Sequence, residues 1–359
     1  MTERIGIFNA GPAVLPEEVL LEAQKDLFNY KGCGQSVMEM SHRSPVFQGI
    51  IDDAMARLKD LMGLGDDYDI LFLLGGASTQ FLMIPMNLCP DDKTCNYVNT
   101  GTWATKALKE AKKLGKKMHI AASSEDKAFT YIPKEMDITD DAAYLHITTN
   151  NTIRGTEYHW IPDVNIPLIA DVSSNFLSKP MDFKKFDMIY GGAQKNIGPA
   201  GMAFVVISKK IQEKLPGNVP TMLDYKTHIS KGSMFNTPPC WTIYIVGLVA
   251  KWIQDNGGLV GIEKINKEKA GYIYNAMDRT DFYSGPVVFE DRSLMNIPFR
   301  LPTEELEKKF IAEAAQENFI GLKGHRSVGG CRASVYNSLP LKWAQKLGHF
   351  MDEFAKNNG

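Results

Sequence analysis

Short apolar runs alternate with amphipathic stretches from about residue 46 to residue 255, and this alternation constrains the fold more than any other feature. Strands are expected over residues 70–74, 96–99, 144–148, 168–170, 188–190 and 203–207. Apolar residues recur at helical spacing over residues 46–62 and 103–114. Helices that separate short strands indicate an α/β domain with a largely parallel sheet.

The pattern changes after Gly257 and Gly258, where long helical segments begin. Beyond this point strands are expected near residues 295–301 and 332–336, and helices over 303–318 and 341–355. A chain of 359 residues usually divides into two domains. We interpret residues 257–359 as the smaller domain.

The charge of the chain is nearly balanced, with 40 Lys and Arg against 42 Asp and Glu and a net charge of −2. A nucleic-acid-binding protein usually carries a basic surplus, so a nucleic-acid partner is not expected. Lys106, Lys109 and Lys113 fall on one side of the helix expected over residues 103–114. We interpret them as a solvated face, because no aromatic platform or second basic run accompanies them.

Membrane insertion and secretion are not expected either. The most apolar stretch, residues 243–250, is far shorter than the roughly 20 residues that cross a bilayer, and the N-terminus lacks a signal-peptide pattern. The five cysteines are odd in number and contain no C-x-x-C pair. This pattern favours a reduced, cytosolic setting and argues against a structural zinc site.

The run at residues 70–74 leads into Gly-Gly-Ala-Ser-Thr at residues 75–79, which opens a helix. Free backbone N–H groups at such a helix start favour an anion, particularly a phosphate. The segment is neither a nucleotide P-loop nor a G-x-G-x-x-G motif. An ordinary tight strand-to-helix turn fits the same residues.

Two ionisable residues follow expected strands. Lys195 sits between glycine-rich turns, where desolvation would favour the free amine that a carbonyl cofactor requires; a surface lysine in a flexible loop is the alternative. Asp171 ends the run at 168–170 and could hold a pyridine nitrogen protonated, or it could be a turn or N-cap residue. Carboxyl ends of parallel strands share one crevice, so the two side chains could meet there.

Motifs over nearly the whole chain resemble those of the fold-type I, class V aminotransferases, which use pyridoxal 5'-phosphate. The matching segments are residues 8–16, 36–43, 75–81, 192–201, 232–239, 322–326 and 329–334, of which 192–201 and 232–239 are the most specific. The resemblance implies a large domain of residues 16–256, with a mainly parallel seven-stranded sheet between helices. It also implies a smaller α+β domain of residues 257–359 together with residues 1–15.

The resemblance also implies the cofactor contacts. Lys195 would bond to the cofactor aldehyde and later move the proton between the substrate Cα and the cofactor C4′, while Asp171 would pair with the ring nitrogen. Trp103 would stack on the ring, although it equally fits the apolar face of its helix. The other implied contacts are Thr152 at the phenolic oxygen, Gly76, Ala77, Ser78 and Gln194 at the phosphate, and Asn236 and Thr237 at the phosphate of the partner subunit in a homodimer.

The implied reaction is a reversible ping-pong transamination of 3-phosphohydroxypyruvate with L-glutamate, which gives O-phospho-L-serine and 2-oxoglutarate in L-serine biosynthesis. Some family members also use the phosphohydroxythreonine pair of pyridoxine biosynthesis. Guanidinium groups suit such anionic substrates because they form bidentate bonds. The family pattern assigns Arg332 to the α-carboxylate, and it assigns the side-chain phosphate or carboxylate to two pairs from two subunits, His42 with Arg43 and His325 with Arg326.

Two departures and two rival functions accompany this hypothesis. Some family members carry an arginine where residues 77–79 read Ala-Ser-Thr, and a serine in place of Ala10.

The first rival function is that of a cysteine desulfurase. Such an enzyme would need a cysteine on a mobile loop, whereas Cys331 lies in an expected strand. A non-catalytic scaffold of the same fold would lack Lys195, Asp171 or the arginine set, all of which are present.

Overall fold

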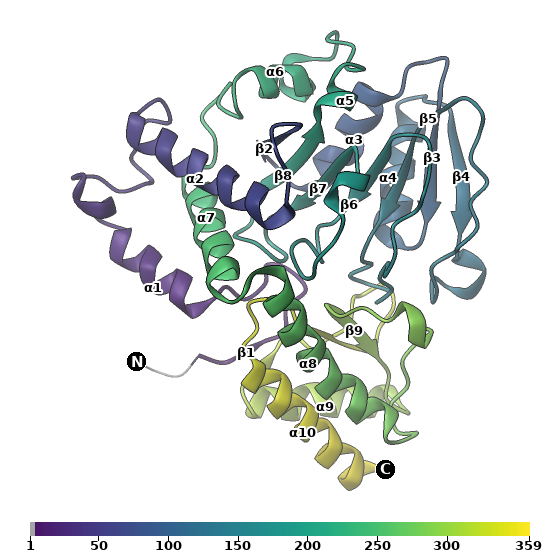
Figure 1. The fold of residues 1–359 in the computed structure, drawn as a ribbon. Coiled ribbons are helices and arrows are strands. Elements are labelled where there is room, and N and C mark those ends of the chain that lie inside the picture. Colours follow the sequence, from purple (N-terminus) through teal and green to yellow (C-terminus); the bar gives the residue numbers. More distant parts are fainter. Residues whose placement is uncertain (1–3) are drawn as a thin grey trace.

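The computed structural model describes residues 4–359, so residues 1–3 of the segment assigned to the small domain lie outside it (Figure 1). Its largest element is a seven-stranded sheet of order β2-β8-β7-β6-β5-β3-β4. Strand β8 is antiparallel to β2 and β7, and the remaining pairs are parallel, which confirms the predicted mainly parallel sheet. The strands are β2 (Tyr68–Leu74), β3 (Thr94–Asn99), β4 (Met118–Ser123), β5 (Ala142–Thr148), β6 (Leu168–Asp171), β7 (Met188–Gly192) and β8 (Met202–Ser208).

Helices cover both faces of this sheet, because successive side chains of a strand point to opposite faces. In β8, Phe204 and Val206 join one apolar cluster and Val205 and Ile207 join another. The first cluster includes α1 (Glu17–Asp26), α2 (Pro45–Met62) and α7 (Cys240–Asp255). The second includes α3 (Ala77–Leu88), α4 (Thr102–Lys113), α5 (Lys209–Gln212) and α6 (Tyr225–Ser230).

A third apolar cluster lies in the C-terminal part of the chain and includes two residues from the N-terminus, Phe8 and Val14. Strand β1 (Gly6–Ile7) pairs in parallel with β10 (Phe319–Ile320), which brings the N-terminal segment to this cluster. Figure 1 shows α8 and α10 side by side below the large sheet. The other elements here are the antiparallel pair β9 (Asn296–Phe299) and β11 (Cys331–Ser334), and the helices α8 (Gly258–Asp278), α9 (Glu304–Gln316) and α10 (Leu341–Asn358).

The boundaries of α2 follow from local chemistry. The Ser44 hydroxyl accepts a hydrogen bond from the Phe47 N–H, and Pro45 occupies the first helical turn, where its missing N–H has no consequence. Gly63 ends the helix with φ of 63°, a left-handed conformation that glycine adopts without strain. No helix within residues 4–359 is both long enough and apolar enough to cross a membrane.

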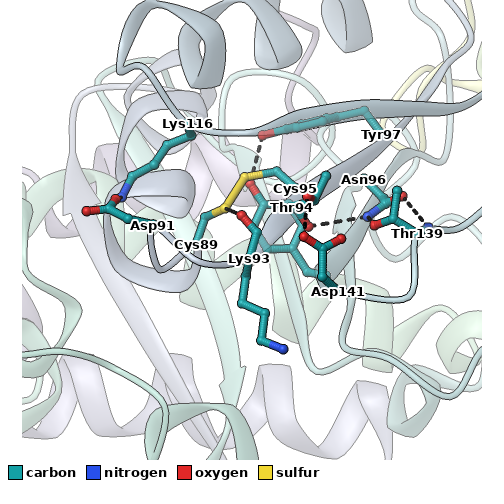
Figure 2. The surroundings of a disulfide bond; sticks show 11 residues. Cys89, Asp91, Lys93, Thr94, Cys95, Asn96, Tyr97, Lys116, Thr139 and Asp141 are labelled. Carbon is teal, nitrogen blue, oxygen red and sulfur yellow. Dashed lines mark hydrogen bonds and ion pairs between the residues drawn. A yellow bond between two sulfur atoms is a disulfide. The ribbon is translucent and has the colours of Figure 1, made fainter.

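Cys89 and Cys95 form a disulfide, which corrects the expectation that the cysteines are reduced (Figure 2). Cys89 follows the last turn of α3, and Cys95 lies at the start of β3. The short loop between them returns the chain from the helix to the sheet, and this return brings the two sulfur atoms together. Cys33, Cys240 and Cys331 are free.

The disulfide predicts a defined thiol count. Titration of the unreduced protein in denaturant should find only the three cysteines that the structure leaves free. The Cys95→Ser variant should lose about 2 kcal/mol of unfolding free energy, because the bridge restricts a short loop in the unfolded chain. The Cys33→Ser variant is the control and should change neither stability nor the bridge. Finding all five thiols free before reduction would contradict the pairing.

Candidate active site

The carboxyl ends of β2, β3, β5, β6 and β7 meet at one edge of the large sheet. Strand β2 points the same way as β7, because the antiparallel strand β8 lies between them. The segments that follow these strands therefore converge, as in other open α/β sheets. A pocket at this edge is lined by Gly76, Ala77, Ser78, Phe81, Trp103, Thr148, Asn150, Thr152, Asp171, Ser173, Ser174, Gln194 and Lys195.

This lining unites all the residues predicted to contact the cofactor from within one subunit. They come from the α3 start, the α4 start, the loop after β5, the end of β6 and the loop after β7. The lining does not include the remaining predicted residues, namely Asn236, Thr237, His42, Arg43, His325, Arg326 and Arg332. Among these, Arg332 contacts a lining residue directly.

Lys195 lies in a short loop after β7, and its Nζ donates a hydrogen bond to Thr152 Oγ1 at 2.7 Å. The pKa of Lys195 is lowered to about 8, mainly by burial: the Asp171 carboxylate opposes this shift, and the Arg332 charge adds a smaller contribution to it. The side chain remains partly open to the pocket. About a tenth of this lysine is therefore a free amine at pH 7, far more than for an ordinary lysine, and a nucleophile or base requires this form.

Asp171, the last residue of β6, is held by Ser173. The Ser173 hydroxyl and N–H both donate to Asp171 Oδ1, at 2.5 and 2.9 Å. Burial raises the pKa of the Asp171 carboxyl, while the Ser173 bonds and the Lys195 charge oppose this rise. Because both bonds end on Oδ1, Oδ2 is the oxygen that a cationic ring nitrogen could meet.

The α3 start has the geometry of an anion site. The helix begins after Gly76, and no side chain caps its first turn. Its leading N–H groups therefore lack helical acceptors and face the pocket that Gly76, Ala77 and Ser78 line. Gly75 has φ of +99°, and a Cβ there would lie 2.7 Å from Thr79 Oγ1, so this turn requires glycine.

Trp103, in the first turn of α4, contributes a flat face to the pocket. Lys195 Nζ lies 5.4 Å from the centroid of its ring, and Lys106 Nζ lies 4.1 Å from it. Its indole Nε1 is buried and forms no hydrogen bond with the described residues. Trp103 packs against a core cluster and lines the pocket, so the core role and the stacking role both fit its position.

Arg332, on β11, brings a cation from the C-terminal cluster to the pocket. Its Nη1 donates to the backbone oxygen of Thr152 at 3.1 Å, while its Nε is buried and has no partner within the described chain, residues 4–359. Burial lowers the pKa of the guanidinium, and this uncompensated desolvation favours an anionic ligand. His325 lies in the field of the same group, since burial, then Arg332 and Arg326, lower its pKa.

The other predicted residues do not line the pocket of this chain. Asn236 and Thr237 form one contact with each other, from Asn236 Nδ2 to Thr237 O at 3.4 Å. His42 Nε2 is buried and has no hydrogen-bond partner among residues 4–359, and Arg43 is exposed. The predicted roles of these residues, which depend on a second subunit, stay predictions.

Sequence reasoning missed the polar residues that support the pocket. Asn150 donates through Nδ2 to Ser174 Oγ and to Asn296 Oδ1, both at 2.8 Å, and its Oδ1 accepts from Ser293 Oγ at 2.6 Å. No sequence signal connects residues so far apart. Ser173 could have been found, because a serine two residues after a strand-ending aspartate commonly bonds back to it.

Comparisons with known proteins identify the family. The model of "Aminotransferase class-V" matches residues 5–342. A phosphoserine aminotransferase of Desulfatibacillum aliphaticivorans is 54% identical over 361 residues, covering 100% of both chains. The solved phosphoserine aminotransferase of Bacillus circulans subsp. alkalophilus superposes with a TM-score of 0.96 at 49% identity, covering 98% of each chain. The pyridoxal-phosphate-bound enzyme of Trichomonas vaginalis superposes with a TM-score of 0.93 at 37% identity, covering 97% of this chain and 99% of that one.

The fold, the lysine site and these matches define a pyridoxal-phosphate-dependent transferase of the class-V aminotransferases. Within that class, the chain belongs to the phosphoserine aminotransferase family. The cysteine desulfurase hypothesis finds no support in the site. Cys331 is buried in β11, and burial raises the pKa of its thiol to about 12, so it is not a reactive thiolate.

The pocket fits pyridoxal 5'-phosphate on three observations. The uncapped α3 start offers N–H donors for a phosphate, the buried Asp171 carboxyl is bonded to Ser173 and to no cation among residues 4–359, and Lys195 presents an amine of lowered pKa. These three groups line one pocket with the flat face of Trp103. Together they match the anionic, cationic and carbonyl groups of this cofactor.

The pKa of Lys195 can be tested through cofactor uptake. In cofactor-free protein the free amine of Lys195 should increase with pH through about 8, compared with 10.5 for an ordinary lysine. Uptake, followed by the absorbance of the bound cofactor, should therefore accelerate with pH and level off above that midpoint. The Asp171→Asn variant removes the charge that raises this pKa, so its midpoint should move to lower pH. The surface variant Asp352→Asn is the control, and an upward shift for Asp171→Asn would contradict the assignment.

Proposed function

We propose that this protein catalyses the reversible transfer of the amino group of L-glutamate to 3-phosphohydroxypyruvate, giving 2-oxoglutarate and O-phospho-L-serine for L-serine biosynthesis. One observation supports this reaction most directly. Thr152 accepts a hydrogen bond from Lys195 through its hydroxyl and another from Arg332 through its carbonyl oxygen. The group that would move the α-proton and the group that would hold the α-carboxylate thus share one anchoring residue.

The chain's own groups have distinct tasks in this proposal. When bound, pyridoxal 5'-phosphate supplies a carbonyl carbon for the amino group and an electron-poor ring that stabilises charge at the substrate Cα. Asp171 keeps the proton on the ring nitrogen, because a buried carboxylate favours a cation beside it. Lys195 removes a proton from the substrate Cα with its Nζ, for which a pKa of about 8 is suitable.

Arg332 holds the substrate α-carboxylate and thereby orients Cα toward Lys195. Its Nε supports this role, because it is buried without a partner in the part of the chain that the structure describes and a carboxylate would satisfy it with a charge-assisted bond. The two substrates share the α-carboxylate position but differ in their distal anion. We assign that anion to the pairs His42 with Arg43 and His325 with Arg326, of which the first comes from the partner subunit.

The same assignment makes the enzyme a homodimer with two shared sites. Asn236 and Thr237 would complete the phosphate site of the partner, which accounts for their separation from the pocket of their own chain. We also propose the domain division into residues 16–256 and residues 257–359 with 1–15. The Arg332 strand then belongs to the small domain, and Lys195 belongs to the large one.

We propose a cytoplasmic location, where small-molecule anionic substrates are available to the enzyme. The Cys89–Cys95 disulfide is unusual for such a setting, in which thiols are generally kept reduced. Both cysteines are buried, so reductants have restricted access to the bridge. Counting the thiols of protein isolated from cells under alkylating conditions would test whether the Cys89–Cys95 disulfide persists in the proposed cytoplasmic location.

The reaction is tested by measuring 2-oxoglutarate production from glutamate and 3-phosphohydroxypyruvate. The Arg332→Gln variant should reduce kcat/KM at least about tenfold for both substrates, since it removes hydrogen bonds to a charged group. Arg279→Gln is the control, because Arg279 pairs with Asp352 on the surface and should leave kcat/KM unchanged. Bound cofactor without amino transfer to this keto acid would refute the substrate, and sulfide release from cysteine would favour a desulfurase.

Shared sites are tested by mixing two inactive homodimers, Lys195→Ala and Arg43→Gln. If Arg43 acts on the partner's site, each mixed dimer contains one intact site and one doubly altered site. Random exchange of subunits should then restore roughly a quarter of the wild-type activity, since half of the dimers are mixed. If Arg43 acts within its own subunit, mixed dimers have no intact site, and no recovery would follow.

A further inference from the structure

Two buried polar side chains of α8, Asn266 and Lys269, have no part in the proposed chemistry. Both are 0% exposed, and both contact the turn that follows β11. Lys269 Nζ donates to the backbone oxygen of Tyr336 and, at 3.1 Å, to that of Asn337. Asn266 Nδ2 donates to Asn337 Oδ1 at 2.8 Å. Helix α8 thus holds this turn through three directional bonds.

Asn337 connects the same turn to the loop of Lys195. The Asn337 N–H donates to Asn196 Oδ1 at 3.0 Å, and Asn196 is the residue that follows Lys195. Asn337 Nδ2 donates to Leu177 O at 2.9 Å, while Asn196 Nδ2 donates to Phe176 O at 2.7 Å. Every polar group of Asn337 therefore has a partner, as a buried asparagine requires.

These contacts join segments that carry both sides of the active site. Arg332 lies on β11, directly before the turn that Lys269 holds, and Lys195 precedes Asn196. The Phe176–Leu177 contacts belong to the segment that continues from Asp171 and Ser173. Lys195, Asp171 and Arg332 are thus connected through backbone positions rather than through the pocket itself.

Packing alone does not explain a lysine at this position. Lys269 bonds to carbonyl groups, and burial lowers its pKa to about 7. A methionine would fill a similar volume without desolvating an amine. The amine does provide two bonds of fixed direction to one turn, which an apolar side chain cannot provide.

We propose that Asn266, Lys269, Asn337 and Asn196 form a positioning network that fixes the Lys195 backbone relative to Arg332. The inference rests on the proposed function only in the roles given to Lys195 and Arg332. None of these four residues lines the pocket, so they would act through the residues they hold. A loosened network would misalign Lys195 and the substrate Cα, which lowers kcat more than it weakens binding.

The test compares Asn337→Leu with a matched control, Asn87→Leu, in the holoenzyme. Asn87 is also a buried asparagine whose side chain bonds backbone groups, namely Met83 O, Leu223 O and Tyr225 N. Hydrogen exchange of the amides of residues 193–200 should accelerate at least about tenfold in Asn337→Leu and stay unchanged in Asn87→Leu. In the amino-transfer assay, kcat should fall at least about tenfold for Asn337→Leu, with KM for glutamate changing less than about threefold.

Two further variants complete the design. Lys269→Met should produce the same pattern, and its effect should be less than additive with that of Asn337→Leu, because both break one network. Asn196→Ala removes the side-chain bonds to Asn337 and Phe176, so this variant can test the network if the other variants do not fold.

The outcomes separate this network from the proposed reaction. Unchanged exchange at residues 193–200, with a stability loss like that of Asn87→Leu, would overturn the positioning role. Faster exchange in a protein that does not transfer amino groups to 3-phosphohydroxypyruvate would support the network and refute the reaction instead.

Discussion

The common direction of the strands at one sheet edge is the constraint on which the rest of the site depends. The start of α3, Trp103, Asp171 and Lys195 come from segments far apart in the chain, and each lies at or just after the carboxyl end of a strand. Only β8 runs the other way, and it contributes no residue to the pocket. The reversed strand lets β2 join the sheet in the common direction, so that the α3 start can face the pocket.

Desolvation at this sheet edge shifts the pKa values of Lys195 and Asp171 in opposite directions. It lowers the pKa of Lys195 and raises that of Asp171, while the attraction between their charges opposes both shifts. A bound ring cation would stabilise the Asp171 carboxylate, and Lys195 would then be free to remain neutral. The pKa values of both groups therefore suit a ligand that carries a cationic ring, which is consistent with a site for a cofactor rather than for a substrate alone.

Local sequence patterns predicted most of the fold and, in the pocket, the glycine turn at residues 75–79, Asp171 and Lys195, because these segments are informative by themselves. Trp103, Thr152 and Gln194 were predicted from the family resemblance. Helices α2 and α4 and six of the sheet strands follow their apolar periodicity. Strand β4 was missed because it lies at the sheet edge, where His119 and other half-exposed residues interrupt any apolar run. The Cys89–Cys95 pair was missed for a different reason: its formation depends on how α3 returns to β3, which no cysteine count reveals.

The contacts that no pattern predicted are those between the two halves of the site. Arg332 belongs to a strand of the C-terminal cluster, whereas Lys195 follows a strand of the large sheet. Apolar surfaces between such parts permit small sliding movements, because their attraction has little directional preference. Hydrogen bonds between buried amides and carbonyls specify both distance and angle, and an unmade bond there costs free energy. The proposed proton transfer between Lys195 and a substrate Cα held by Arg332 would need that specification, and the proposed network of buried asparagines between these halves would provide it.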